Sequence, residues 1–167
     1  MAKTDENLAA AFAGESQANR KYLAFAKKAD EEGQKQVAKL FRAAAAAETV
    51  HAHNHLRAMG GVKSTADNLK AAMAGENYEF TKMYPDFITD AKAEKKREAL
   101  GSFAMANKVE AIHFKLYTAA AEALKGGKAM PKVDYYVCDI CGNTVEGQPP
   151  DQCPICGNPK KGFMKIE

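Results

Sequence analysis

Patterns that would place this chain in a membrane or on nucleic acid are missing. The 167 residues contain no tryptophan, and the longest apolar runs cover only residues 8–13 and 43–47. These runs are far shorter than the roughly 18 apolar residues of a membrane-spanning helix. The formal net charge is only +3, and no basic block or basic stripe interleaved with aromatic residues occurs, so the footprint of nucleic-acid binding is absent. We therefore expect neither a membrane nor a nucleic acid among its partners.

The first residues also lack the features of a secretory signal peptide. Lys3 is followed at once by Asp5 and Glu6, and the apolar run after them is shorter than the roughly 7–15 residues of a signal sequence. All four cysteines fall between Cys138 and Cys156. In a chain of the reducing cytoplasm, such clustering indicates metal ligation rather than disulfides. These observations predict a cytoplasmic protein.

Proline is scarce until late in the chain, and its distribution predicts a domain boundary. Pro85 is the single proline before residue 131, in a region rich in the strong helix formers Ala, Lys, Glu and Leu. From Pro131 onward come the other five prolines and all four cysteines. Gly126 and Gly127 form a helix stop that Pro131 reinforces. We predict a helical domain over 1–126, a linker over 127–134 and a cysteine domain over 135–167.

The helical part is expected to contain four long helices. Ser64, with Asp67 three residues later, is suited to cap the third helix, and Pro85 is expected to bend it. Very short loops join the first helix to the second and the third to the fourth, which predicts an antiparallel four-helix bundle with a longer crossover in the middle. The expected helices span about 5–32, 34–59, 64–91 and 95–125.

An internal repeat relates the two halves of this region. The tripeptide that ends at Glu15 recurs 61 positions later and ends at Glu76. The motif Glu48-x-x-His51 recurs 62 positions later as Glu110-x-x-His113. Each half is therefore a helix pair with one Glu on its first helix and Glu-x-x-His on its second.

These repeated residues point to a site for two metal ions. Residues three apart on a helix share a face, so each Glu-x-x-His pair can grip one ion. Glu15 and Glu76 lie mid-helix among alanines and aromatic residues, where burial of an unpaired carboxylate costs several kcal/mol. One Glu-x-x-His alone is a weak signal, but two inside one repeat predict the di-iron or di-manganese carboxylate arrangement.

Two positions depart from the repeat. Glu79 lies three residues after Glu76 on the same face, while the counterpart of Glu79 is Ala18. Glu79 is therefore either an ordinary surface residue or a seventh ligand that makes the two metal positions unequal. His55 lies four residues after His51, but its counterpart is a tyrosine, so we expect His55 to lie outside the site.

The cysteines form two Cys-x-x-Cys turns separated by 11 residues. Two sulfurs at this spacing can reach one ion, and two such pairs complete a tetrahedral site. Gly142 and Gly157 let the backbone turn behind the metal. Four thiolates suit either zinc or iron, so a plain zinc ribbon is one interpretation and an iron centre is the other. The expected ligands are Cys138, Cys141, Cys153 and Cys156.

With both modules in view, the sequence resembles the rubrerythrins over essentially its whole length. That family joins a ferritin-like di-iron four-helix bundle to a rubredoxin-like domain. The resemblance therefore implies an all-α four-helix bundle followed by a small four-cysteine β/loop domain. The residues that match the family's di-iron ligands are Glu15, Glu48, His51, Glu76, Glu79, Glu110 and His113. The four cysteines match its rubredoxin-like iron site.

The resemblance also implies cofactors and particular roles for single residues. It implies two non-haem iron ions in the bundle and one iron in the four-cysteine site, where zinc can substitute. Tyr22 and Tyr84 match tyrosines that lie near the family's di-iron site. Glu79 and His51 are implied to exchange on one iron upon reduction, which makes these four residues the expected catalytic set.

The function implied by the resemblance is a peroxidase that reduces hydrogen peroxide to water and protects against oxidative stress. Electrons would come from an NAD(P)H-linked rubredoxin reductase or from rubredoxin, through the four-cysteine iron. The family also implies a homodimer or higher homo-oligomer, with the rubredoxin-like domain of one chain near the di-iron site of another.

Two rival functions remain open from the sequence. A ferroxidase or iron-handling protein of the ferritin type would need the dinuclear site but no electron-delivering cysteine centre. A non-enzymatic scaffold with a zinc ribbon would need the cysteines but not the repeated carboxylates. The presence of both modules favours the peroxidase.

Overall fold

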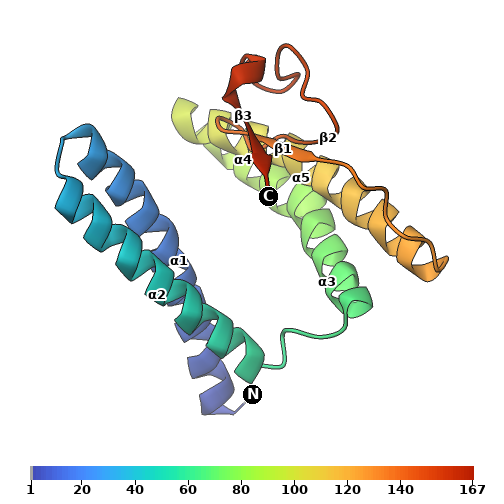
Figure 1. Cartoon of the computed structure of the whole chain (residues 1–167), viewed down its shortest axis with the longest axis horizontal. Coiled ribbons are helices and arrows are strands. Elements are labelled where there is room, and N and C mark those ends of the chain that lie inside the picture. The colour runs from blue at the N-terminus through green and yellow to red at the C-terminus, as the bar shows by residue number, and fades with distance from the viewer. Residues whose placement is uncertain (1) are drawn as a thin grey trace. The chain divides into compact units, whose positions relative to one another are not determined.

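The computed structural model describes residues 2–167 as two helical hairpins and a small sheet (Figure 1). The helical elements are α1 (Lys3–Glu31), α2 (Lys35–Ala58), α3 (Thr65–Tyr78), the π-helix η1 (Glu79–Met83), α4 (Tyr84–Ala93), α5 (Arg97–Lys125) and the 3-10 helix η2 (Lys160–Gly162). The strands are β1 (Tyr135–Cys138), β2 (Thr144–Glu146) and β3 (Phe163–Ile166). Among the described residues, no helix combines the length and the apolar character needed to cross a membrane.

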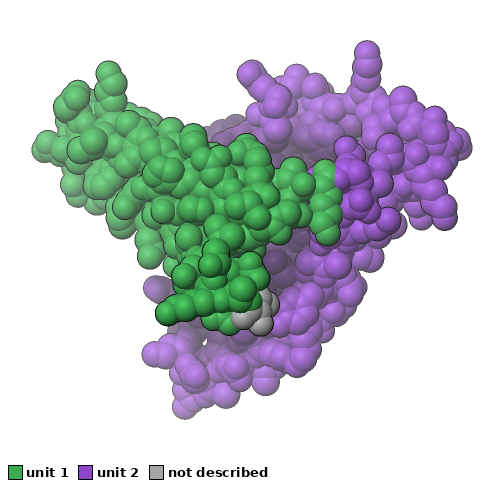
Figure 2. Space-filling view, turned by 90° about the horizontal axis from the view of Figure 1, so that it is seen from below, with its two compact units in different colours: residues 1–63 green, residues 64–167 purple. Residues whose placement is uncertain are grey.

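The chain divides into two compact units, of which the first ends at Lys63 and the second begins at Ser64 (Figure 2). The first unit is the α1–α2 hairpin, and the second holds α3, η1, α4, α5 and the sheet. The structure therefore groups the second hairpin with the cysteine region. The predicted domains over 1–126 and 135–167 remain a prediction, although α5 does end at Lys125 and β1 does begin at Tyr135.

Small side chains hold α1 against α2. Ala26, Ala38 and Ala45 are almost fully buried, and such small residues let the two backbones approach closely. The buried Asn19 bridges the helices, because its Nδ2 donates to the Ala45 carbonyl at 2.7 Å and to Thr49 Oγ1 at 2.8 Å. This polar bridge fixes the register of α1 on α2 within about one turn of the expected metal ligands.

The second hairpin confirms the predicted cap of its first helix. The Ser64 hydroxyl accepts a hydrogen bond from the Asp67 amide at 3.2 Å and caps α3. The bend expected at Pro85 stays a prediction, and the helix departs from α geometry just before this residue, over η1. Pro85 lies in the first turn of α4, where a residue without an amide hydrogen is tolerated.

The π-helix absorbs a one-residue insertion in the second half of the repeat. Glu15 and Glu76 are 61 positions apart, whereas Tyr22 and Tyr84 are 62 apart. The loops that join the helices of each hairpin have equal lengths, so the additional residue lies inside the helix. A π-turn holds one residue more than an α-turn, and η1 begins at Glu79, the residue that breaks the repeat.

The cysteine region folds around a three-stranded antiparallel sheet with the strand order β2-β1-β3. Tyr135 pairs with Glu146 on one side of β1, and Cys138 pairs with Phe163 on the other. Cys138, Cys153 and Phe163 form its buried core. A module this small has little apolar core of its own, so its fold depends on whatever joins the four sulfurs.

Candidate functional site

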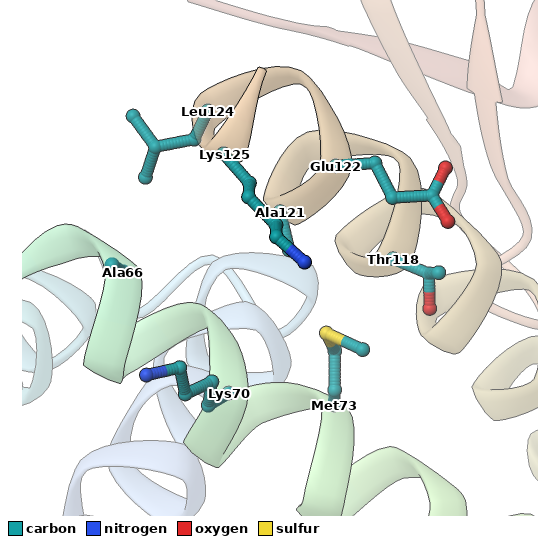
Figure 3. Close-up of a pocket in the computed structure, with 8 residues that line it drawn as sticks. All are labelled: Ala66, Lys70, Met73, Thr118, Ala121, Glu122, Leu124 and Lys125. Atoms are coloured by element: carbon teal, nitrogen blue, oxygen red, sulfur yellow. The ribbon is translucent and has the colours of Figure 1, made fainter. Parts of the chain in front are cut away.

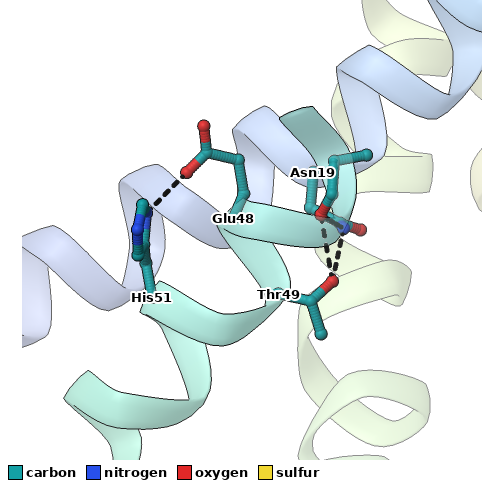
Figure 4. A network of polar contacts seen from close by, with 5 residues as sticks. Asn19, Glu48, Thr49 and His51 are labelled. Atoms are coloured by element: carbon teal, nitrogen blue, oxygen red, sulfur yellow. Dashed lines mark hydrogen bonds and ion pairs between the residues drawn. The ribbon is translucent and has the colours of Figure 1, made fainter. Parts of the chain in front are cut away.

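The first unit brings together Glu15 of α1 with Glu48 and His51 of α2, a set that we call the first triad. One ligand atom from each of the three side chains lies within 4.8 Å of the others. His51 Nδ1 is 3.0 Å from Glu48 Oε2 (Figure 4). The Glu48 side chain is only 18% exposed, whereas that of His51 is 54% exposed. The Glu48 carboxylate is thus mostly buried, whereas the His51 imidazole is exposed.

The second unit brings together Glu76 of α3 with Glu110 and His113 of α5, the second triad. Their ligand atoms also lie within 4.8 Å of one another. His113 Nδ1 is 2.8 Å from Glu110 Oε2 and 3.7 Å from Glu76 Oε1. The two hairpins therefore carry the same constellation, as the repeat predicted, with two carboxylates and one imidazole in each.

Electrostatics in the first triad favour a bound cation. The pKa of Glu15 is raised, chiefly because its carboxyl group donates a hydrogen bond to Glu48 and also because of burial and the charge on Glu48. The pKa of Glu48 is lowered by that same hydrogen bond and by one from His51. The two carboxyl groups thus oppose each other's ionisation, and a divalent ion bound between them would relieve this.

The second triad also holds carboxyl groups whose ionisation is opposed by burial and by neighbouring charges. Burial raises the pKa of Glu76, and the charges on Glu110 and Glu79 raise it further. Burial and the charge on Glu110 also raise the pKa of Glu79. Three carboxyl groups therefore destabilise one another here unless protons or cations compensate their charge.

Glu79 lies beside the second triad but outside its tight group. Its charge acts on Glu76, although the atoms within 4.8 Å of one another belong to Glu76, Glu110 and His113 alone. The π-helix places Glu79 at its first residue, and such bulges are frequent at functional sites. The role of Glu79 as a seventh ligand stays a prediction.

The two tyrosines expected near the site occupy equivalent places in the two hairpins. Tyr22 packs against Phe25 and Phe41, with ring centroids 6.4 and 6.2 Å away. Tyr84 packs in the same way against Phe87 and Phe103, both at 6.2 Å. Burial and the charges on Glu110, Glu79 and Glu76 raise the pKa of Tyr84. Tyr84 therefore lies close to the second triad and keeps its proton at neutral pH.

His55 is not part of the first triad. The ligand atoms that lie within 4.8 Å of one another belong to Glu15, Glu48 and His51. The charge on His55 contributes to lowering the pKa of Glu15, but less than that on His51 does.

The four cysteine sulfurs are arranged as ligands of a single ion. All four Sγ atoms lie within 4.8 Å of one another. Cys138 Sγ is 3.6 Å from Cys156 Sγ, and Cys141 Sγ is 3.5 Å from Cys153 Sγ. Metal–sulfur bonds of about 2.3 Å place the sulfurs of a tetrahedron about 3.8 Å apart. The donor set therefore fits a tetrahedral metal.

Each cysteine turn lowers the pKa of its first thiol. Burial alone would raise the pKa of Cys138, but hydrogen bonds from backbone amides and from Asn158 lower it to about 6. The pKa of Cys153 is lowered by the equivalent amides, against the same burial penalty. Burial raises the pKa of the second cysteines, Cys141 and Cys156. A metal ion is needed to bring all four to the thiolate form.

Two asparagines support the sulfurs, and the sequence analysis missed them. Asn158 Nδ2 donates to Cys138 Sγ at 3.4 Å, and Asn143 Nδ2 donates to Cys153 Sγ at 3.6 Å. Each asparagine follows the second cysteine of its own turn by two residues and reaches the first sulfur of the other turn. The signal was the repeated pattern Cys-x-x-Cys-Gly-Asn, of which only the cysteines and glycines were used.

Thr144 connects the cysteine region to the second triad. Its hydroxyl donates to the Gly142 carbonyl at 3.1 Å and lies 2.9 Å from His113 Nε2. The contact holds the imidazole by its Nε2 atom. It leaves Nδ1 facing the carboxyl groups of Glu110 and Glu76, on the side where a metal ion would bind. No sequence motif pointed to this contact.

A surface pocket of the second unit lies apart from these ligands. Residues from the start of α3 and the end of α5 line it, among them Met73, Lys70 and Glu122 (Figure 3). Its lining includes one carboxylate and two lysines but no histidine or cysteine, so it offers no metal site. The chemistry of the chain is concentrated instead in the two triads and the four-cysteine site.

Comparison with known families accounts for both modules. Residues 6–121 match the rubrerythrin family model, and residues 136–164 match the model of the rubrerythrin rubredoxin-like domain. Rubrerythrin-2 of Clostridium acetobutylicum is 33% identical over 177 aligned positions, which cover 98% of this chain and 96% of the relative. Nigerythrin of Nitratidesulfovibrio vulgaris is 38% identical over 178 positions, which cover 98% of this chain and 86% of the relative.

Solved structures give the same assignment. The structure of nigerythrin in its fully reduced, all-ferrous state matches with a TM-score of 0.59 and 36% identity. That match covers 99% of this chain and 88% of nigerythrin. Together with the observed helices and the small sheet, these matches confirm the predicted ferritin-like helical fold with a C-terminal four-cysteine domain. The residues expected to hold the two kinds of iron are present as candidate sites.

Replacing Asn158 by alanine is expected to lower the reduction potential of an iron bound by the four cysteines. The reduced site carries one more negative charge and therefore gains more from the amide donor. A bond that is stronger by about 1.4 kcal/mol in the reduced state corresponds to about 60 mV for one electron. A spectroelectrochemical titration of the sulfur-to-iron absorption band measures this shift.

Asp139→Ala is the matched control for this variant. The Asp139 carboxylate accepts from the same amide group at 2.7 Å, and its removal leaves the donor to the sulfur in place. We expect no lowering of the potential in the control. An unchanged potential in Asn158→Ala would show that the sulfur contact has no influence on the iron.

Proposed function

The chain belongs to the rubrerythrin family, and we propose that it is a non-haem di-iron peroxidase that reduces hydrogen peroxide to water. The observation that supports this function best is the contact between its two kinds of metal site. Thr144 of the cysteine region is hydrogen-bonded to His113 of the second triad. A four-thiolate centre joined to a carboxylate/histidine site suits electron delivery to that site.

The proposal assigns the six residues of the two triads to one pair of iron ions. Two iron ions held there would supply the two electrons that reduction of one peroxide molecule requires. The four triad carboxylates balance the charge of two divalent ions. Such ions would offset the hydrogen bond to Glu48 that raises the pKa of Glu15, and the burial and neighbouring charges that raise that of Glu76. Nδ1 of His51 and of His113 completes the set.

Residues around the triads are assigned to donate hydrogen bonds and to set the local charge. Tyr84 keeps its proton beside the carboxyl groups and can donate a hydrogen bond to an oxygen bound near them. Tyr22 is its counterpart in the other hairpin and is assigned the same role. Glu79 adds a negative charge next to the second triad, and an exchange between Glu79 and His51 upon reduction remains part of the proposal.

The four-cysteine site is assigned to electron relay. A single iron held by four thiolates changes its charge by one, and the site is partly open, because Cys141 and Cys156 are only half-buried. Rubredoxin or an NAD(P)H-linked rubredoxin reductase is the proposed donor. Protection against oxidative stress in the cytoplasm is the proposed setting.

The ferroxidase alternative explains less of the structure. Iron oxidation for storage needs the triads but gives no role to a cysteine centre that is hydrogen-bonded to one of their histidines. The scaffold alternative gives no role to six carboxylate and histidine residues that share an internal repeat. The peroxidase proposal gives a role to both modules and to the contact between them.

Cys138→Ser tests the division of labour between the modules. The variant is expected to lose the red colour of the sulfur-bound iron and to keep its helices, because the two modules have separate ligands. Peroxide should still oxidise the chemically reduced protein once, at the wild-type rate. Steady NADH-linked peroxide reduction through a reductase should fall at least about tenfold, which is about 1.4 kcal/mol on the barrier.

Ile140→Ala is the matched control, since Ile140 lies between two cysteines but is 62% exposed. It should keep both the colour and the turnover. Undiminished NADH-linked turnover in Cys138→Ser would contradict the relay. Failure of the single oxidation by peroxide in the wild-type protein would contradict the peroxidase function itself.

Glu79→Ala is expected to keep both bundle irons on the six triad residues and to slow the reaction with peroxide. Removal of one negative charge from a region of low dielectric disfavours the more highly charged Fe(III) state. We expect the rate to fall at least about tenfold, or about 1.4 kcal/mol on the barrier. Stopped-flow mixing of the reduced variant with peroxide gives the rate. Glu122→Ala removes an exposed carboxylate of α5 and serves as the control, which should react with peroxide at the wild-type rate. A wild-type rate in Glu79→Ala would show that Glu79 is an ordinary surface glutamate.

A further inference from the structure

One buried polar atom of the second unit has no hydrogen-bond partner. It is Oδ1 of Asn107 on α5, and among residues 2–167 no other buried side-chain oxygen or nitrogen is unpaired. An unpaired buried acceptor destabilises a folded protein, so such atoms are rare. Asn107 precedes Glu110 by three positions, and residues at this spacing lie on the same side of a helix. The unpaired atom therefore belongs to a residue one helical turn from a predicted metal ligand.

The internal repeat places Asn107 opposite the π-helix. Its counterpart 62 positions earlier is Ala45, which is 1% exposed and lies beside Asn19. The counterpart of Asn19 falls inside η1 whether the offset is taken as 61 or 62, and η1 packs against α5. Asn107 thus faces the short segment that begins at Glu79 and leads into Tyr84.

The packing of the hairpin does not require an amide at this position. In the first hairpin Asn19 donates to the Ala45 carbonyl and to the Thr49 hydroxyl, which completes a polar bridge between the helices (Figure 4). The sequence of the second hairpin does not repeat this bridge, because an alanine stands at position 111 in place of Thr49. An alanine also packs at the place that corresponds to Asn107. The unpaired amide of Asn107 therefore indicates a ligand rather than a structural bond.

The groups around Asn107 define the chemistry of that ligand. The carboxylates of Glu110 and Glu79 accept hydrogen bonds but donate none once they are ionised. The Tyr84 hydroxyl keeps its proton and is a donor, but Oδ1 of Asn107 is not bonded to it. A molecule that lies between Tyr84 and Asn107 must accept a hydrogen bond from the first and donate one to the second.

We propose that Asn107 is a specificity-determining residue of the peroxide site, whose Oδ1 accepts a hydrogen bond from hydrogen peroxide. Hydrogen peroxide has two O–H groups, so it can donate to Asn107 and accept from Tyr84. Dioxygen carries no hydrogen and leaves Oδ1 unpaired. A site built to bind an O–H group rejects an analogue that lacks it, so Asn107 favours hydrogen peroxide over dioxygen as the oxidant. This inference rests on the proposed peroxidase function.

Oxidation by the two oxidants tests the assignment in Asn107→Ala and Asn107→Leu. Both variants remove the acceptor, and leucine also fills the volume, so that water does not replace the amide. Each full-length, iron-loaded protein is reduced and mixed in a stopped-flow instrument with one oxidant. Hydrogen peroxide takes two electrons from the reduced site and two protons from the solvent, its O–O bond breaks, and two water molecules form. Dioxygen takes two electrons and two protons and becomes hydrogen peroxide, which added catalase removes.

We expect the rate with hydrogen peroxide to fall at least about tenfold in both variants, because one hydrogen bond to the substrate is lost. The rate with dioxygen should stay within about twofold of the wild-type rate, since dioxygen makes no such bond. Unchanged rates, or an equal loss with both oxidants, would overturn the inference while the wild type still reacts with peroxide. A reduced wild type that does not react with peroxide would overturn the proposed function, and this inference with it.

Thermal unfolding of the metal-free proteins tests the assignment without catalysis. Asn107→Ala removes an amide whose acceptor is unpaired, so its Tm should stay within about 2 °C of the wild-type value or rise. Asn19→Ala is the matched control, because it removes a buried amide that donates to two acceptors. Its Tm should fall by at least about 3 °C, and the ratio of its two oxidation rates should stay at the wild-type value. A Tm that falls as far in Asn107→Ala as in Asn19→Ala would make Asn107 a structural residue and contradict the proposal.

Discussion

Six carboxyl and imidazole groups held on the apolar side of helices create the constraint on which the rest of this chain depends. The pKa of Glu15 is raised chiefly by its contact with Glu48, and that of Glu76 by burial and by the charges on Glu110 and Glu79. Such groups destabilise a bundle unless protons or cations compensate them. Divalent ions would remove this penalty, so metal binding and assembly of the helical region are expected to be coupled. The exposed apolar faces of the hairpins add a second reason for assembly.

The cysteine region turns this metal-binding bundle into a candidate redox system. Its four sulfurs are spaced for one ion, and asparagine amides support two of them. Thr144 then links the region to His113 and orients the imidazole so that Nδ1 faces the carboxyl groups. The Thr144 hydroxyl thus contacts both the cysteine region, at the Gly142 carbonyl, and the second triad, at His113. The contact lies within the second unit, which explains why the sheet and the second hairpin form one compact body.

Most of the fold and the ligand sets could be predicted because helical periodicity and an internal repeat leave local signals. The repeat brought Glu15, Glu48 and His51 together correctly, and the cysteine spacing did the same for the sulfurs. The π-turn over η1 was not predicted, although the change of the repeat offset from 61 to 62 already recorded the one-residue insertion that it absorbs. The two asparagines had a local signal in the repeated Cys-x-x-Cys-Gly-Asn pattern, whereas Thr144 depends on a tertiary contact with His113 that no local pattern reports. The predicted longer crossover corresponds to the connection over residues 59–64, which is longer than the loop inside either hairpin.

The central claim is that two triads on separate hairpins act as one di-iron centre. Mössbauer and EPR spectra of the oxidised, iron-loaded protein test it most directly, because they distinguish coupled from isolated ferric ions. The account predicts three iron ions per chain, of which one gives the signal of a four-thiolate site and two are antiferromagnetically coupled and EPR-silent. Two additional isolated high-spin ferric signals, one for each triad, would show that the triads never meet and would contradict the account.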